Sequence, residues 1–317
     1  MGPIVTFSSN AEHFITLFDK SYLPLGISLN SSLSRHAKNF HLWILCMDET
    51  VEKQLLELNL PSTTIVPIRE VETKELLSVK TNRSIGEYCW TLTPFTPQIV
   101  FDRAPQVKRA TYIDADLFFF SSPEKIFREL EAIDKDVLIT EHAYAKEYDQ
   151  TATSGRFCVQ FMTFNNNTGG KRVLHWWQDR CLEWCYARYE DGKFGDQMYL
   201  NDWPTRFENE VHVLDQRPLA MGPWNARSFF DENYPPVFYH FHGLRVLSPE
   251  KVILYAHYKI GKAKRLYTAY LSALKVAFAL MQSKHITIPT MIRKQSTMAR
   301  AKLFINQLIG RVKIASI

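Results

Sequence analysis

The stretch ATYIDADLFFF, residues 110–120, decides how the fold is read. Four mostly apolar residues, Ala110–Ile113, lead into Asp114 and Asp116, and the apolar run Leu117–Phe120 follows. An apolar approach and exit place the two acids at the end of a buried strand, whereas two solvated acids in a surface turn would lack such flanks. Because ligands bind beyond the carboxyl ends of strands in open α/β sheets, we predict that both aspartates face a ligand.

Short apolar runs alternate with helical stretches over the first 120 residues. The runs that read as strands are Ile4–Phe7, His41–Cys46 and Thr64–Ile68, and the helices fall near Leu23–Ser34 and Thr50–Leu58. This alternation is typical of βαβ units, in which helices flank a parallel sheet. We therefore predict an α/β fold with a mixed, mostly parallel sheet.

The second half of the chain adds further elements of the same kind. Strand-like runs at Val137–Thr140 and Cys158–Phe164 precede an asparagine-rich turn at Asn165–Asn167. A long helix is predicted over roughly Lys171–Tyr189, because its apolar residues keep to one face. No internal repeat or linker interrupts the chain before about residue 258, so residues 1–258 are predicted to form one domain.

The composition is that of a folded globular protein. Of 317 residues, 46% are hydrophobic and 22% are charged, which excludes disordered and fibrous classes. Five cysteines without a CxxC pair argue against a structural zinc site and favour a reducing compartment. The first ten residues lack the pattern of a signal peptide, so we expect a cytoplasmic protein.

Charge is distributed unevenly along the chain. Residues 1–250 carry a formal charge of −8, whereas residues 251–317 carry +13 and contain no acidic residue. Two stretches of this tail, Leu266–Leu280 and Met298–Ile314, mix aliphatic and basic residues but are shorter than the ~20 apolar residues of a membrane span. We predict a basic helical extension over residues 259–317 that lies on an anionic membrane surface. The alternative is that these stretches pack as ordinary terminal helices.

The paired aspartates point to metal chemistry. Two carboxylates separated by one residue can hold a hard divalent cation whose other positions are filled by phosphate oxygens. His240 follows the apolar run Val237–Tyr239, and Phe241, His242 and Gly243 come directly after it. A neutral imidazole suits Mn²⁺ better than Mg²⁺. We therefore predict a Mn²⁺ (or Mg²⁺) site made by Asp114, Asp116 and His240, with His242 as the reserve ligand.

Four short segments, taken in chain order, resemble the motifs of one enzyme family. They are the helix start YLPLGISL (Tyr22–Leu29), the metal motif YIDAD (Tyr112–Asp116), the element DQMYLN (Asp196–Asn201) and the H-x-x-G motif HFHG (His240–Gly243). The sequence is therefore similar to GT-A-fold glycosyltransferases, in particular to glycosyltransferase family 8 and its bacterial lipopolysaccharide-sugar transferases.

This resemblance implies a GT-A-like, Rossmann-like catalytic domain over residues 1–258. It implies metal-dependent transfer of a hexose from a nucleotide-diphosphate sugar, expected to be a UDP-sugar, to a glycolipid or oligosaccharide acceptor. It also implies retention of anomeric configuration, with Asp196 and Gln197 positioning the acceptor and stabilising the developing charge on the sugar. From the residues alone, Asp196 could equally be the base of an inverting enzyme or a helix N-cap after Gly195.

Further residues are expected to contact the donor. They are Thr6, Ser8, Ser9, Arg83 and Arg245. The threonine and the two serines lie at the end of the predicted first strand, and the aromatic pair Tyr88 and Trp90 is expected near the same pocket. The family has a K-P-W after its histidine motif whose lysine contacts the diphosphate, but this chain has Leu244–Leu247 (LRVL) there. Arg245 is the predicted replacement. The family's N-A-G is matched only loosely by Asn165–Asn167, so sugar specificity does not carry over.

Two other classes of function use the same features. A nucleotidyltransferase or a phosphodiester hydrolase also uses paired aspartates, but the segment Ile4–Asn10 lacks the glycine-rich phosphate loop expected of the former. A non-catalytic, membrane-associated protein that binds sugar nucleotides would account for the basic tail. Nucleic-acid binding is disfavoured, because the tail shows aliphatic stripes and not basic residues interleaved with exposed aromatics.

Overall fold

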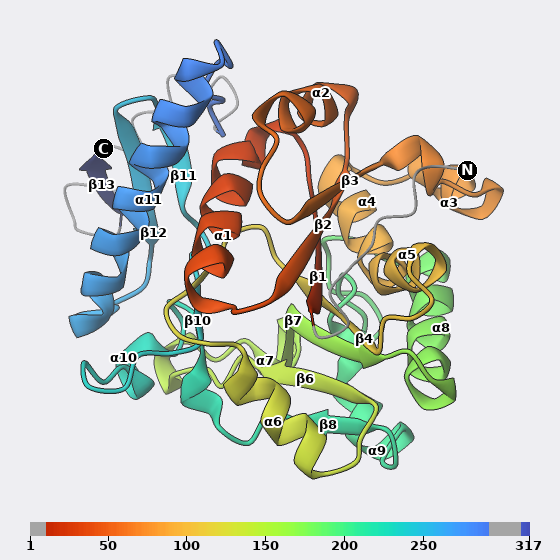
Figure 1. The fold of residues 1–317 in the computed structure, drawn as a ribbon. Coiled ribbons are helices and arrows are strands. Elements are labelled where there is room, and N and C mark those ends of the chain that lie inside the picture. The colour runs from red at the N-terminus through yellow and green to blue at the C-terminus, as the bar shows by residue number, and fades with distance from the viewer. Residues whose placement is uncertain (1–10, 292–311) are drawn as a thin grey trace.

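The computed structural model describes residues 11–291 and 312–317. Its centre is a seven-stranded sheet with helices on both faces (Figure 1). In spatial order the strands are β3 (Thr63–Pro67), β2 (Phe40–Cys46), β1 (Glu12–Phe18), β4 (Arg109–Ile113), β7 (Phe157–Asn165), β6 (Val137–Glu141) and β8 (Val211–Val213). Six strands share one direction and β7 runs against them. The predicted α/β class with a mostly parallel sheet is therefore confirmed.

Two apolar cores lie on the two sides of this sheet. The helices that contribute to one core include α1 (Leu23–His36), α2 (Glu49–Leu58), α6 (Glu124–Ala132) and α11 (Lys264–Ser283). Those that contribute to the other are α3 (Lys74–Lys80), α4 (Ile85–Leu92), α5 (Thr96–Arg103) and α8 (Thr168–Glu183). Short helices α7 (Thr151–Ser154), α9 (Trp203–Arg206) and α10 (Ala226–Phe229) lie in the connecting segments. This two-sided burial accounts for the nearly continuous apolar character of the central strands.

Local capping sets where several helices begin and end. The Asp48 side chain accepts from Val51 N at 2.8 Å at the start of α2, and Asn59 ends that helix in the left-handed conformation with φ 46°. Asn167 caps α8 by accepting from Gly170 N at 2.9 Å. The predicted helix Lys171–Tyr189 therefore starts three residues earlier than expected, and it ends sooner because Trp184 is extended.

The first described strand was not predicted. The predicted first strand, Ile4–Phe7, lies outside the described residues, and β1 instead pairs in parallel with both β2 and β4. Its sequence EHFITLF begins with two polar residues, which hides the apolar run that follows. At its end, Phe18 packs so closely on α1 that a side chain at Gly26 would collide with its ring. β1 is thus the central strand against which the first helix is fixed.

Two small sheets complete the molecule. One contains β5 (Leu117–Phe119), β10 (Phe238–His240) and β9 (Ala220–Met221), and the other contains β11 (Arg245–Ser248), β12 (Lys251–Ala256) and β13 (Val312–Ser316). The chain passes from the large sheet into the first small sheet between β4 and β5. Residues 114–116, the predicted metal motif, form this passage.

Helix α11 packs into the core that also contains the buried residues of α1. Helix α11 (Lys264–Ser283) lies along α1, and Tyr267, Tyr270 and Leu274 on its apolar face are buried (Figure 1). The apolar stripe of Leu266–Leu280 therefore packs against the protein, as the alternative of ordinary terminal helices expects. The boundary at residues 258/259 and the contact of residues 259–317 with a membrane surface stay predictions. Most of Met298–Ile314 lies outside the described residues. Within residues 11–291 and 312–317, no helix is both long and apolar enough to cross a bilayer.

Candidate active site

Three chain segments converge where β4 ends. Asp114 N donates to Gln160 O of β7 at 3.0 Å, and Phe241 N donates to Asp116 O at 2.9 Å. In the small sheet, His240 pairs with Leu117 in antiparallel register. Backbone pairing therefore brings His240 beside two aspartates that lie more than a hundred residues earlier in the sequence.

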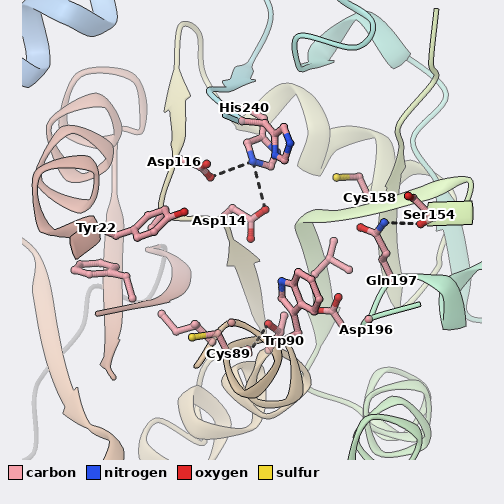
Figure 2. A pocket seen from close by; sticks show the side chains of 18 of the residues that line it. Tyr22, Cys89, Trp90, Asp114, Asp116, Ser154, Cys158, Asp196, Gln197 and His240 are labelled. Carbon is pink, nitrogen blue, oxygen red and sulfur yellow. Dashed lines mark hydrogen bonds and ion pairs between the residues drawn. The ribbon is translucent and has the colours of Figure 1, made fainter. Parts of the chain in front are cut away.

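The three side chains form a compact cluster. His240 Nε2 lies 3.0 Å from Asp116 Oδ1 and 3.8 Å from Asp114 Oδ2 (Figure 2). One ligand atom from each residue falls within 4.8 Å of the others. Asp116 and His240 are buried, whereas Asp114 is partly exposed. Two carboxylates and one imidazole at this spacing fit a divalent cation, so the predicted metal residues do come together.

A hydrogen-bonded chain behind the cluster orients His240. Thr140 Oγ1 donates to Cys158 O and accepts from Gln160 Nε2, both at 3.4 Å. With its amide nitrogen used in this way, Gln160 turns Oε1 toward His240 Nδ1 at 2.9 Å. Nδ1 therefore carries the proton that this oxygen accepts, and Nε2 is the imidazole nitrogen that faces the carboxylates.

The cluster is electrostatically coupled. Burial acts to lower the pKa of His240, but the neighbouring Asp116 outweighs it and raises that pKa well above its usual range. Burial also acts to raise the pKa of Asp116, but His240, with a smaller contribution from Arg245, lowers it to about 2. Burial raises the pKa of Asp114. Without a cation, a proton on His240 thus balances the acidic pair, and a bound cation would take over that balance.

The cluster lies in the middle of a pocket of about 1020 Å³ that follows the edge of the large sheet. We call its two ends the β1 end and the β6 end. The β1 end is lined by Phe18, Asp19, Tyr22, Cys89 and Trp90. The β6 end is lined by His142, Tyr144, Gln150, Ser154, Trp224 and Tyr258. Figure 2 shows Tyr22 on one side of the cluster and Ser154, Cys158 and Gln197 on the other.

Asp196 and Gln197 also line the pocket, and Figure 2 shows Asp196 near Trp90 and Gln197 near Ser154. Burial raises the pKa of Asp196 well above its usual range, and the nearby Asp114 carboxylate adds to this. Gln197 Nε2 donates to Ser154 O, which leaves its amide oxygen for a ligand. The next helical turn starts at Met198 with Gln197 as its N-terminal flank, so Asp196 is not the helix cap that the sequence also allowed.

Only some of the residues predicted to contact the donor line the pocket. Arg245 lines the pocket, where its charge reaches both Asp116 and Tyr22. Thr6, Ser8 and Ser9 lie outside the described residues. Trp90 lines the β1 end, whereas Tyr88 is buried and donates to Glu72 Oε1 at 2.9 Å.

Arg83 lies away from the pocket. Its guanidinium donates to Cys181 O and to Leu182 O, both at 2.7 Å, and also to Thr91 Oγ1. These acceptors lie on α4 and on the last turn of α8, where carbonyl groups lack helical partners. This placement does not support the predicted donor contact, because the guanidinium is already engaged in joining two helices.

Sequence reasoning missed several pocket residues. Gln160 and Cys158 project from the same side of β7, and a glutamine inside the apolar run FCVQFMTF was a visible signal of a buried polar partner. Although burial raises it, His142 and His240 lower the pKa of Cys158 to about 7. Tyr144, Trp224 and Tyr258 gave no comparable signal, because aromatic residues are common in cores.

Comparison with known proteins places the chain among relatives of similar length. No protein-family model matches it. The uncharacterized protein YfnF of Bacillus subtilis (strain 168) is 32% identical over 256 residues, which is 75% of this chain and 84% of YfnF. The uncharacterized protein YfnD of the same organism is 30% identical over 282 residues, covering 83% of this chain and 88% of YfnD.

Two solved structures of glycosyltransferases align with the chain at low identity. Mouse xyloside xylosyltransferase 1 in its apo form is 16% identical, with a TM-score of 0.49, over 74% of this chain and 98% of that chain. The apo-form glycosyltransferase GlyE of Streptococcus pneumoniae TIGR4 is 14% identical, with a TM-score of 0.49, over 90% of this chain and 66% of that chain. At the identity and coverage of the Bacillus subtilis relatives, by contrast, the chain belongs to the protein family of YfnF and YfnD.

Proposed function

We propose that this protein is a metal-dependent glycosyltransferase that moves a hexose from a nucleotide-diphosphate sugar, a UDP-sugar, onto a glycan or glycolipid acceptor. The observation that carries the proposal is the cluster of Asp114, Asp116 and His240 in the middle of a long pocket. A ligand site occupies the same place in other open α/β sheets, where strand order reverses between neighbouring strands. Here that point lies between β1 and β4.

The strand order at the pocket edge supports a proposal for the order of the subsites. Strand β1 lies beside β4, β7 follows β4, and β6 follows β7. The nucleotide is placed at the β1 end, where Tyr22 and Trp90 offer aromatic faces, and the diphosphate at the cluster on β4. The transferred sugar then lies over β7 and the acceptor over β6. The nucleotide base thus meets aromatic rings, and the diphosphate meets the charged cluster.

The charged residues of the pocket fit a diphosphate. A divalent cation held by the two carboxylates and His240 Nε2 would supply Lewis-acid neutralisation of the leaving group. Arg245 adds a fixed positive charge within reach of Asp116. This arrangement supports Arg245 as the replacement for the family's diphosphate-binding lysine.

Asp196 and Gln197 are assigned to the sugar side of the reaction. The raised pKa of Asp196, due to burial and then to Asp114, suits a carboxyl group that keeps its proton and donates a hydrogen bond to a hydroxyl, and not the carboxylate base of an inverting enzyme. Gln197 presents its amide oxygen to the positive charge that develops on the sugar. These roles favour the retaining outcome that the family resemblance implies, and NMR of the anomeric proton in the first-formed product tests it.

The decisive experiment is a thermal-shift panel of UDP-, GDP- and CMP-sugars with and without Mn²⁺. A ligand that binds only the folded state raises its stability. We expect a UDP-sugar to raise Tm only when Mn²⁺ is present, and turnover to release a nucleoside diphosphate. If no sugar nucleotide stabilises the protein in the presence of Mn²⁺, the proposal is wrong. Release of pyrophosphate or of a nucleoside monophosphate would instead identify a nucleotidyltransferase or a phosphodiester hydrolase.

We also propose that the protein works at the inner face of a membrane. The +13 charge of residues 251–317 supports this, since each basic residue near an anionic surface contributes about 1 kcal/mol. Because the apolar stripe of α11 is buried, the contact would rest on charge. Binding to vesicles of phosphatidylcholine with phosphatidylserine should then disappear at high salt, and binding to pure phosphatidylcholine should be absent. Salt-resistant binding would contradict a purely electrostatic contact.

A further inference from the structure

Two tyrosines at the β6 end of the pocket are each preceded by a strained residue. Ala143 has φ 47° immediately before Tyr144, and His257 has φ 68° immediately before Tyr258. Residues with a Cβ rarely adopt this left-handed conformation, and it persists only where surrounding contacts impose it. Both tyrosines line the pocket, although they come from separate segments of the chain. Two of the non-glycine residues with positive φ thus directly precede tyrosines that line the pocket.

The strain at Ala143 produces a stacked pair of rings. In an extended strand, residues two apart lie about 6.6 Å from each other. Here the rings of His142 and Tyr144 are 4.5 Å apart and nearly parallel, at 9°. The left-handed residue between them closes the gap, so that Tyr144 presents a flat, partly exposed ring backed by an imidazole.

This pair is fixed rigidly to the metal cluster. His142 O accepts from Trp224 Nε1 and from Asn225 Nδ2, both at 2.8 Å, and Ala145 N donates to Trp224 O at 2.9 Å. The Trp224 ring in turn lies 5.3 Å from His142 and 5.3 Å from His240. One buried tryptophan thus joins the stacked rings to the predicted metal ligand.

The second tyrosine is held by a neighbouring aromatic residue. Tyr258 packs edge-on against Tyr148 with ring centroids 5.0 Å apart, and Lys259 N donates to Tyr148 Oη at 2.6 Å. Polar side chains, Gln150 and Ser154, line the same part of the pocket. The β6 end therefore combines partly exposed aromatic faces with hydrogen-bonding groups.

This combination matches a sugar ring better than other ligands. A pyranose has an apolar face of C–H groups, which packs on an aromatic ring, and a rim of hydroxyl groups that hydrogen-bond. The nucleotide base is assigned to the β1 end, three strands or roughly 14 Å away at the usual strand spacing. A lipid chain would leave Gln150 and Ser154 without hydrogen-bond partners from the ligand.

We propose that Tyr144 and Tyr258 form the acceptor subsite and stack on a pyranose ring, so that the acceptor is a glycan or a glycoside. This inference rests on the proposed function for its assignment of the pocket ends. It names the two side chains that would bind the sugar ring of the acceptor.

The test separates acceptor binding from donor binding. Saturation-transfer NMR of the wild-type protein with UDP and Mn²⁺ is recorded against methyl glycosides of glucose, galactose, mannose and N-acetylglucosamine, and against their octyl glycosides. We expect at least one methyl glycoside to bind, and Tyr144→Ala and Tyr258→Ala each to weaken it about tenfold. Tyr144→Phe keeps the ring and should bind within about threefold of the wild type. Tyr234→Ala removes an exposed tyrosine outside the pocket and should change nothing.

The outcomes distinguish the two proposals. If UDP and Mn²⁺ bind but no methyl or octyl glycoside does, or if both alanine variants bind glycosides like the wild type, the acceptor subsite is wrong and the proposed function stands. If UDP fails to bind with Mn²⁺, the proposed function itself fails. A glycoside that binds in both forms with equal affinity indicates a soluble glycan acceptor, whereas tighter binding of the octyl form indicates a glycolipid. Either pattern supports the pyranose subsite, provided that the alanine variants lose it.

Discussion

Two clusters in the described chain each contain two acidic residues and one histidine. Asp114, Asp116 and His240 make one, and Glu129, His212 and Asp215 make the other; in both, the candidate ligand atoms lie within 4.8 Å of one another. By residue type and spacing alone they are equivalent metal sites. Their surroundings differ, and the difference shows which of them is built for a ligand.

The second cluster is already occupied by the protein's own hydrogen bonds. Glu129 Oε1 accepts from Asp215 N at 2.6 Å and lies 2.7 Å from His212 Nε2, while Gln216 Nε2 donates to Glu129 Oε2 at 3.5 Å. These contacts tie α6 to the end of β8, and none of the three residues lines the pocket. A carboxylate that receives a backbone N–H has a structural use without any cation.

The first cluster shows the opposite arrangement. Its imidazole is bonded from behind by Gln160, so that Nε2 faces the carboxylates and the pocket. The comparison teaches that the outer hydrogen bonds, and not the set of ligand residues, separate a candidate metal site from a structural tie. The predictions below test this difference in order of their expected effect on metal binding.

Asp116→Asn should have the largest effect. The amide keeps the shape but removes the charge that pairs with His240 and that a divalent cation requires. We expect Mn²⁺-dependent stabilisation to vanish and transfer to fall by about 10²–10³-fold, measured by thermal shift and by nucleoside diphosphate release. Asp215→Asn makes the same chemical change in the second cluster and should leave both measurements unchanged. Equal loss in the two variants would contradict the comparison.

Gln160→Leu should have the next largest effect. Leucine fills a similar volume but cannot accept from His240 Nδ1, so the imidazole loses the bond that fixes its tautomer and orientation. We expect Mn²⁺ affinity, measured by calorimetry, to fall by about 10–100-fold while the protein stays folded. The matched control is Gln178→Leu, which removes another buried glutamine; its Nε2 donates to Pro94 O, and it does not line the pocket. If Gln160→Leu binds Mn²⁺ as tightly as the wild type, whatever the control does, Gln160 does not support the metal site.

Changing the pH should alter Mn²⁺ affinity more gently. Burial acts to lower the pKa of His240, but Asp116 outweighs burial and raises this pKa well above the ordinary value of a free histidine, about 6.5. The raised pKa stabilises the metal-free fold below pH 6.5, and this contribution is lost as the pH rises through the folded-state value. A cation must displace that proton, so affinity should increase with pH by about tenfold per unit from pH 6.5 upward. Calorimetry in buffers of different ionisation enthalpy counts the protons released. A release near zero at pH 7 would contradict a protonated His240.

The sequence was informative where chemistry is local and silent where it depends on distant contacts. Asp114 and Asp116 were found because their apolar flanks lie next to them, and His240 because it follows an apolar run. Arg83 looked like an anion ligand, since an arginine that binds helix-end carbonyls reads the same in sequence. The apolar stripe of Leu266–Leu280 did not reveal that α1 covers it. The strained Ala143 and His257 left no local trace, because contacts elsewhere impose their conformations.

Glu129→Gln should have the smallest effect on the metal and still be measurable in stability. The variant keeps an acceptor for Asp215 N but loses the charge that strengthens this bond and the contact with His212. Because the Glu129 side chain is only 11% exposed, the bond is poorly screened by water. We expect urea unfolding to show a loss of about 1–2 kcal/mol, with Mn²⁺ affinity unchanged. A variant that kept its stability but lost Mn²⁺ binding would contradict the assignment of the two clusters. In that case Glu129 would be a metal ligand, and its hydrogen bonds would not stabilise the fold.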